Sequence, residues 1–291
     1  MAISAKLVKQ LRDKTGAGMM DCKKALTATD GDLEKAVDWL REKGIAKAAK
    51  KQSRIAAEGL CNVLVNGEEA IIYELNSETD FVSKNENFTN LLDQVGQAIL
   101  NSTASNLEEA LTVELDGKTL ETVLVEATAR IGEKISLRRV SRFVKEATSS
   151  FGAYKHMGGK IVALTVLDGA DEETAKDVAM HVAAQNPLYL DQSFIPQEVR
   201  DHEKDVLTNE ALNEGKPANI VEKMVLGRLN KYFKGICLVN QPFIKDPDLT
   251  VEKYVSTKKG KILTYLRLEV GEGIEKRVDD FASEVMSQVN A

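Results

Sequence analysis

The same pattern of two apolar strands, a glycine turn and an amphipathic helix occurs twice along the chain. In the first copy, alternating apolar residues predict strands over 60–65 and 69–75. Asn66-Gly67 is expected to join them, because both residues tolerate positive φ in a two-residue turn. A helix is predicted near 86–100. This segment therefore predicts a compact unit of mixed helix and sheet.

The second copy has the same architecture in different letters. Residues 150–167 predict a hairpin with Gly158-Gly159 as its turn, followed by a helix near 171–185. The segment 131–143 can supply a further strand to either copy. The repeat predicts two related α+β subdomains.

Outside the repeat, the N-terminal residues have the period of helices. Residues 1–44 predict a small three-helix unit, whose last helix is expected to end at Gly44. The Ala/Lys-rich residues 45–54 are expected to form a connecting helix or a linker.

A second helical region lies near the C-terminus. Residues 196–233 predict an antiparallel helical hairpin, interrupted at Gly215-Lys216-Pro217. The tail adds a strand over 262–270 and a last helix over 275–289. In the hairpin, the apolar face of the first helix is expected at Val199, Val206 and Ala211.

These patterns predict an α+β multidomain fold in six parts. They are an N-terminal three-helix domain with its linker (1–54), a core N-subdomain (55–145), a core C-subdomain (146–195), a protruding helical hairpin (196–233), the remainder of the core C-subdomain (234–270) and a C-terminal helical module (271–291).

Composition narrows the function classes. A formal net charge of −6 over 291 residues argues against a general nucleic-acid binder. Cys22, Cys61 and Cys237 lie far apart, so no disulfide framework is indicated. No apolar run reaches the roughly 20 residues of a membrane span, and no targeting segment is recognised, so the cytoplasm is expected. The basic run over 43–54 is typical of a solvated helix face.

An apolar ring stands in the polar connection after the first hairpin. The connection contains Thr79, Asp80, Phe81 and Val82, whereas the second copy has the ordinary acidic helix entry DGADEE at 168–173. The repeat therefore does not require the phenylalanine. Thr79-Asp80 could cap a helix with Phe81 tucked against it, or Phe81 could enter another molecule.

The search for catalytic chemistry finds little. The histidines have no metal-ligand spacing, and no nucleophile elbow or phosphate-binding loop is present. Glu74, Glu78 and Asp80 could hold a cation or act as acid and base, but no further group converges on them from the sequence. We therefore predict no catalytic residue, metal ligand or cofactor.

Two stretches resemble the signatures of the bacterial elongation factor Ts family. They are LRDKTGAGMMDCKKAL at 11–26 and NSETDFVSK at 76–84. The resemblance continues in order along essentially the whole chain. It implies an N-terminal ubiquitin-associated-like domain before the two subdomains, and guanine-nucleotide exchange on the GTPase elongation factor Tu. The further matching segments are 154–161, 179–184, 227–231, 241–243 and 270–274.

The resemblance also implies roles for the residues around the unexpected ring. Thr79, Asp80, Phe81 and Val82 match the loop that enters the GTPase beside its Mg²⁺ and phosphate site. Phe81 is then a wedge that displaces the groups supporting the metal, Asp80 disturbs the groups that hold Mg²⁺, and Val82 anchors the base of the loop.

Further contacts with the GTPase are implied elsewhere. The stretch Gly16, Ala17, Gly18, Met19 and Met20 resembles a surface that packs on a GTPase helix, and the region of His156 resembles a grip on another of its domains. His181 is expected to be structural. No direct contact with nucleic acid or membrane is implied.

The helical hairpin carries self-association in some members, so a homodimer through it is a possible assembly. Two positions depart from the family pattern. Ser83 stands where Ala is common and should leave the wedge intact, and Leu226 stands where Glu is frequent and does not settle whether the chain dimerises.

Two alternatives to an exchange factor remain open. A non-catalytic helical interaction scaffold would bind through the N-terminal domain, and its acidic loop would be only a capped turn. A carboxylate-metal enzyme would hold a divalent ion in the isolated protein.

Overall fold

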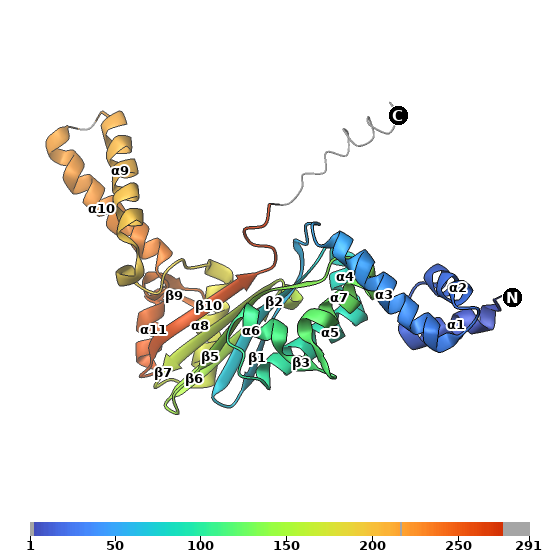
Figure 1. The fold of residues 1–291 in the computed structure, drawn as a ribbon. Coiled ribbons are helices and arrows are strands. Elements are labelled where there is room, and N and C mark those ends of the chain that lie inside the picture. Colours follow the sequence, from blue (N-terminus) through green and yellow to red (C-terminus); the bar gives the residue numbers. More distant parts are fainter. Residues whose placement is uncertain (1–2, 216, 276–291) are drawn as a thin grey trace. The chain divides into compact units, whose positions relative to one another are not determined.

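The computed structural model describes residues 3–215 and 217–275 and has a mixed helix and sheet architecture (Figure 1). The α+β multidomain fold is confirmed. The chain divides into two compact units. The first contains the described parts of Met1–Asn62, Tyr73–Arg142 and Glu269–Ala291, and the second contains Val63–Ile72 and Phe143–Leu268. The six-part division stays a prediction, and the predicted last helix lies outside the described residues from 276 onward.

Three helices form the N-terminal part of the first unit: α1 (Ala5–Thr15), α2 (Met19–Ala28) and α3 (Leu33–Lys51). Ser4 caps α1 and Asp32 caps α3 by accepting bonds from free backbone amides. Gly16 ends α1 with a φ of 66°, which favours glycine. Apolar residues from all three helices pack together, at Val8, Leu11, Cys22, Ala25, Leu26 and Ala36.

The prediction that Gly44 ends the third helix is wrong, because α3 continues to Lys51. A Cβ added at Gly44 would lie 2.9 Å from the Cβ of Ala129 in α7 (Leu120–Ile131), closer than real side chains approach. Gly44 therefore permits close helix packing within the first unit, and most of the expected connecting segment is helical.

The first sheet has the strand order β1-β2-β5, formed by β1 (Glu58–Asn66), β2 (Glu69–Ser77) and β5 (Ser136–Val144). The segment expected to join either copy therefore joins the first. The predicted Asn66-Gly67 turn is displaced by one residue: Asn66 ends β1, and residues 67–68 make the turn. Only Gly67 has positive φ there, as in a type II′ turn.

Helix α5 (Glu86–Leu100) confirms the helix predicted after the first hairpin and packs against Tyr73 of β2. The Tyr73 hydroxyl donates to the carbonyl of Leu92 at 2.7 Å. A Cβ at Gly96 would lie 2.0 Å from that hydroxyl, so the glycine leaves the space that the tyrosine fills. The remaining elements before α7 are α4 (Asp80–Ser83), α6 (Leu107–Thr112), β3 (Glu114–Leu115) and β4 (Lys118–Thr119).

The second sheet has the strand order β10-β7-β6, formed by β6 (Ser149–His156), β7 (Ile161–Asp168) and β10 (Lys261–Glu269). All of these residues except Glu269 belong to the second unit. The predicted Gly158-Gly159 turn lies within a 3-10 turn, Met157–Gly159, in which all three residues have positive φ. Helix α8 (Glu172–Gln185) follows as predicted.

Helix α8 and the strands share an apolar core with the segment that leads to β10. A Cβ at Gly152 would lie 2.0 Å from the backbone oxygen of Ala175, so α8 approaches β6 as closely as glycine allows. That segment contains η3 (Leu238–Asn240), β8 (Pro242–Phe243), β9 (Asp246–Thr250) and α11 (Val251–Thr257).

Helices α9 (Gln197–Asn213) and α10 (Ala218–Ile236) form the predicted hairpin and project from the β10-β7-β6 sheet of their unit (Figure 1). One predicted face residue is wrong: Val206 is exposed, and its neighbour Leu207 is buried instead. The helices meet through Leu207, Ala211, Val221, Val225 and Leu229. None of the helices in the described ranges is long and apolar enough to span a membrane.

Candidate partner-binding site

The 79–82 turn holds Phe81 away from the protein. Thr79 precedes α4, and its hydroxyl oxygen accepts the Val82 amide at 3.4 Å, so the capping interpretation is correct for this residue. Asp80 follows at the start of α4 and pairs with Lys84 at 2.7 Å. Phe81 is 82% exposed, so its ring is not tucked against a helix. The turn is therefore capped by Thr79 and carries an exposed aromatic ring at its tip, whereas Val82 is half-buried at its base.

The three acidic residues near this turn do not converge on one site. Glu74 is fully buried and accepts bonds from Arg138 and Arg139. Glu78 accepts from Arg54 and from the Lys134 amide. A divalent cation at Glu74 would have to displace two guanidinium groups that already neutralise the carboxylate. Among the described residues, no group of three or more His, Cys, Asp and Glu side chains could hold a metal ion.

The 16–20 stretch forms the corner between α1 and α2. Gly16 lies against Arg130 of α7, where a Cβ would come within 2.9 Å of the arginine Cδ. Gly18 is the N-cap of α2 and supplies no side-chain cap. Ala17 packs inward on the N-terminal core. Met19 and Met20 begin α2 and are 44% and 64% exposed. The corner thus presents two adaptable apolar side chains on a backbone of small residues.

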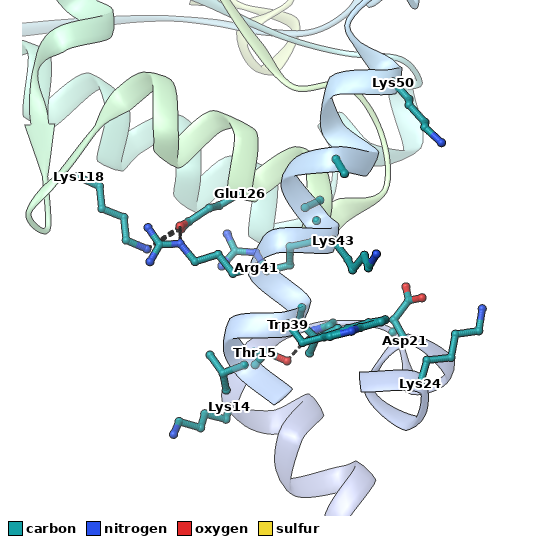
Figure 2. Close-up of a pocket in the computed structure, with 18 residues that line it drawn as sticks. Lys14, Thr15, Asp21, Lys24, Trp39, Arg41, Lys43, Lys50, Lys118 and Glu126 are labelled. Carbon is teal, nitrogen blue, oxygen red and sulfur yellow. Dashed lines mark hydrogen bonds and ion pairs between the residues drawn. The ribbon is translucent and has the colours of Figure 1, made fainter. Parts of the chain in front are cut away.

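A cleft of about 550 Å³ opens beside this corner, between the N-terminal helices and α7 (Figure 2). Trp39 is half-buried in its wall, and the Lys43 ammonium lies 5.8 Å from the centre of the indole ring. The two carboxylates of the lining are Asp21 and Glu126, and Glu126 pairs with two of the cations. Cations outnumber these carboxylates, although the whole chain has a net negative charge. The cations of the lining are Lys14, Lys24, Arg41, Lys43, Lys50, Lys118 and Arg130. The cleft is therefore a locally positive surface, which the overall charge did not reveal.

His156 is exposed at the end of β6 in the second unit. Its ring stacks on Tyr154 with 6.0 Å between the ring centres. The exposed Met157 follows at once in the 3-10 turn. These residues form an exposed edge of mixed aromatic and apolar character.

His181 is buried and structural in its contacts. Its Nδ1 accepts the Ile244 amide at 3.2 Å, which leaves Nε2–H to donate to Gln241 Oε1 at 2.9 Å. Burial lowers the pKa of His181, because the charged ring would lose its hydration. A neutral histidine therefore links α8 to the segment before α11.

The hairpin exposes apolar side chains of its own. Leu226 in α10 is 55% exposed. Arg228, two residues later, joins the two helices through Glu214 at 2.9 Å and Glu210 at 3.9 Å. The hairpin is therefore fastened internally and still presents apolar surface, at Leu212, Ile220 and Leu226.

Comparison with protein families gives two matches. A family model described as elongation factor TS matches residues 78–272, which is more than half of the chain. A model described as elongation factor Ts, mitochondrial, N-terminal matches residues 1–49. The first match contains the whole 79–82 turn and His156, and the second contains the 16–20 stretch. The chain belongs to the elongation factor Ts family.

Proposed function

We propose that this chain is a guanine-nucleotide exchange factor that binds GDP-bound elongation factor Tu and releases GDP so that GTP can bind. The observation that carries the proposal is Phe81, an aromatic ring exposed at the tip of a capped turn. Family membership supports the class of partner. The activity changes no covalent bond, so it calls for no catalytic residue and no cofactor.

The wedge mechanism follows from what the 79–82 turn offers. Burying an exposed phenylalanine in a partner contributes roughly 1.5–3 kcal/mol, without needing a hydrogen-bond partner there. Asp80 enters with the ring and brings negative charge near the groups that hold Mg²⁺. Loss of the ion leaves the phosphates uncompensated, because the metal neutralises part of their charge. Exchange factor and nucleotide then weaken each other's binding by the same factor.

Two further surfaces would hold the GTPase while the wedge acts. The 16–20 stretch supplies the N-terminal grip through Met19 and Met20, and the positive cleft beside it favours an acidic partner surface. His156 and its stacked tyrosine supply the second grip. The binding energy of these two grips would then offset the cost of inserting Phe81 into the GTPase.

We also propose a homodimer through the helical hairpin, supported by the exposed Leu226. The place of action proposed is a bacterial cytoplasm, because the 11–26 and 76–84 motifs resemble bacterial members. The alternative place of action is the mitochondrion, because the N-terminal family model is described as mitochondrial. No direct contact with nucleic acid or membrane is part of the proposal.

The experiment is stopped-flow release of a fluorescent GDP analogue from elongation factor Tu, with and without this chain. Accelerated release that saturates with the chain's concentration is expected. Binding without acceleration would instead support the scaffold, for which the capped turn and the positive cleft would suffice. Neither binding nor acceleration would discard both functions.

A further inference from the structure

A carboxylate outside the 79–82 turn holds the first residue of that turn. Thr79 donates its backbone N–H to Glu133 Oε2 at 2.9 Å and its hydroxyl to Glu133 Oε1 at 2.7 Å. Glu133 is half-buried and follows Gly132, which ends α7 with a φ of 94°. Both carboxylate oxygens are thus directed at Thr79, and bonds to an ionised acceptor are about twice as strong as neutral ones.

The same corner is bonded on its other side to the end of α3. The Lys134 amide donates to Glu78 Oε1 at 2.6 Å, and its ammonium donates to the carbonyls of Gln52 at 2.6 Å and Arg54 at 3.1 Å. Arg54 in turn pairs with Glu78 at 3.1 Å. Residues 132–134 therefore join the start of the turn to the end of the long N-terminal helix.

Phe81 depends on this attachment more than a packed side chain would. With 82% of its surface exposed, the ring has few contacts of its own, so its position is set by the backbone of the turn. The helix that carries it, Asp80–Ser83, is only one turn long and cannot hold its shape by itself. Whatever fixes Thr79 therefore fixes the ring two residues later.

We infer that Glu133 is a positioning residue for nucleotide release: it aims Phe81 by fixing the backbone of Thr79. The inference rests on the proposed exchange function. In this role Glu133 acts through Thr79 and does not need to touch the GTPase or the nucleotide. Without its carboxylate, the two Thr79 donors turn to water, and the ring samples directions in which it does not enter the partner.

The first test needs no partner. Amide hydrogen exchange is measured by NMR at Val82 and Ser83 in the free protein and in Glu133→Ala. Both amides donate to Thr79 and not to Glu133, so they report on the turn. The exchange rate of these amides should rise on the order of tenfold in the variant, because the two charge-assisted bonds to Thr79 are lost. Glu133→Gln, which keeps one carbonyl oxygen, should give a smaller rise. Unchanged exchange at both amides would overturn the inference.

The matched control is Glu109→Ala. Glu109 accepts the Ser105 amide at 2.8 Å and its hydroxyl at 2.9 Å, the same pair of bonds at a different place in the first unit. This variant should leave exchange at Val82 and Ser83 unchanged. A rise equal to that of Glu133→Ala would show a general loosening of the unit and would also overturn the inference.

The second test combines variants in the GDP-release assay. Glu133→Ala should lower the maximal release rate about tenfold, with little change in the concentration for half-saturation. In a Phe81→Ala background the same change should have no further effect, because there is no ring left to aim. A full further loss there would contradict positioning. If Phe81→Ala alone leaves GDP release intact, the wedge mechanism fails. The amide hydrogen-exchange measurement still decides whether Glu133 orders the turn.

Discussion

Removal of the buried Glu74 carboxylate should destabilise the first unit strongly. Its side chain is inaccessible, and it accepts bonds from Arg138 at 3.0 Å, Arg139 at 2.5 Å and the Gly271 amide at 2.8 Å. The carboxylate therefore fastens the segment after β10 to strands β2 and β5. Breaking a buried ion pair from one side typically costs 3–5 kcal/mol.

The arginines decide where in that range Glu74→Ala falls. Their side chains are 29% and 27% exposed, so each can recover part of its hydration once the carboxylate is gone. We therefore expect a loss of about 3 kcal/mol, the lower end of the range. Glu74→Gln keeps the shape and one acceptor oxygen, and should cost roughly 1–2 kcal/mol.

Urea unfolding followed by far-UV circular dichroism measures this loss. With an m-value of about 3 kcal/mol/M, the midpoint of Glu74→Ala should fall by about 1 M. Glu114→Ala is the control, since Glu114 is exposed in β3, and it should stay within about 0.5 kcal/mol of the parent. A midpoint for Glu74→Ala that matches this control would refute the reasoning, as would a glutamine variant no better than alanine.

Two further predictions concern pH and helix packing. Because the pKa of His181 lies below its usual 6.5 in the folded chain, the unfolded chain binds the proton more readily. The contribution of neutral His181 to the free energy of unfolding should be complete above about pH 6.5. It should fall as the pH drops below 6.5, by at most about 1.4 kcal/mol per pH unit. His181→Gln should flatten this slope in urea titrations, and an unaltered slope would assign it to other groups. At Gly44, valine should destabilise the unit by about 1–3 kcal/mol through its clash with Ala129, monitored by the fluorescence of the sole tryptophan, Trp39. If Gly44→Ala instead gains the full helix-propensity difference of about 1 kcal/mol, the two helices are not in close contact.

The elements of the repeated unit could be predicted because their signals are local. The apolar pattern alone placed the helix after the first hairpin at 86–100, where α5 lies. Errors arose where a distant partner decides. Glycine is a common residue at helix ends, but at Gly44 the close packing on Ala129 requires glycine inside α3. Ala129 is far from Gly44 in the sequence, so the local pattern does not show this contact. The shift from Val206 to Leu207 likewise depends on how α10 meets α9.

The candidate site was only partly accessible to the same reasoning. The sequence allowed both a capped turn and an exposed ring at Thr79 and Phe81, and the structure contains both. Glu133 could not be found, because its bonds to Thr79 span 54 positions along the chain. The positive cleft was also missed, since its cations come from five separate elements, α1, α2, α3, β4 and α7.

The central claim, that Phe81 releases the nucleotide, is tested most directly by comparing two phenylalanines. Phe81→Ala and Phe194→Ala both remove an exposed ring, and Phe194 lies in the 3-10 turn before α9, in the other unit. The measurement is the maximal rate of fluorescent-GDP release from elongation factor Tu, together with binding to the nucleotide-free GTPase. We expect Phe81→Ala to slow release at least tenfold while it still binds, and Phe194→Ala to release GDP at the parent rate. Equal release by the parent and Phe81→Ala would contradict the account.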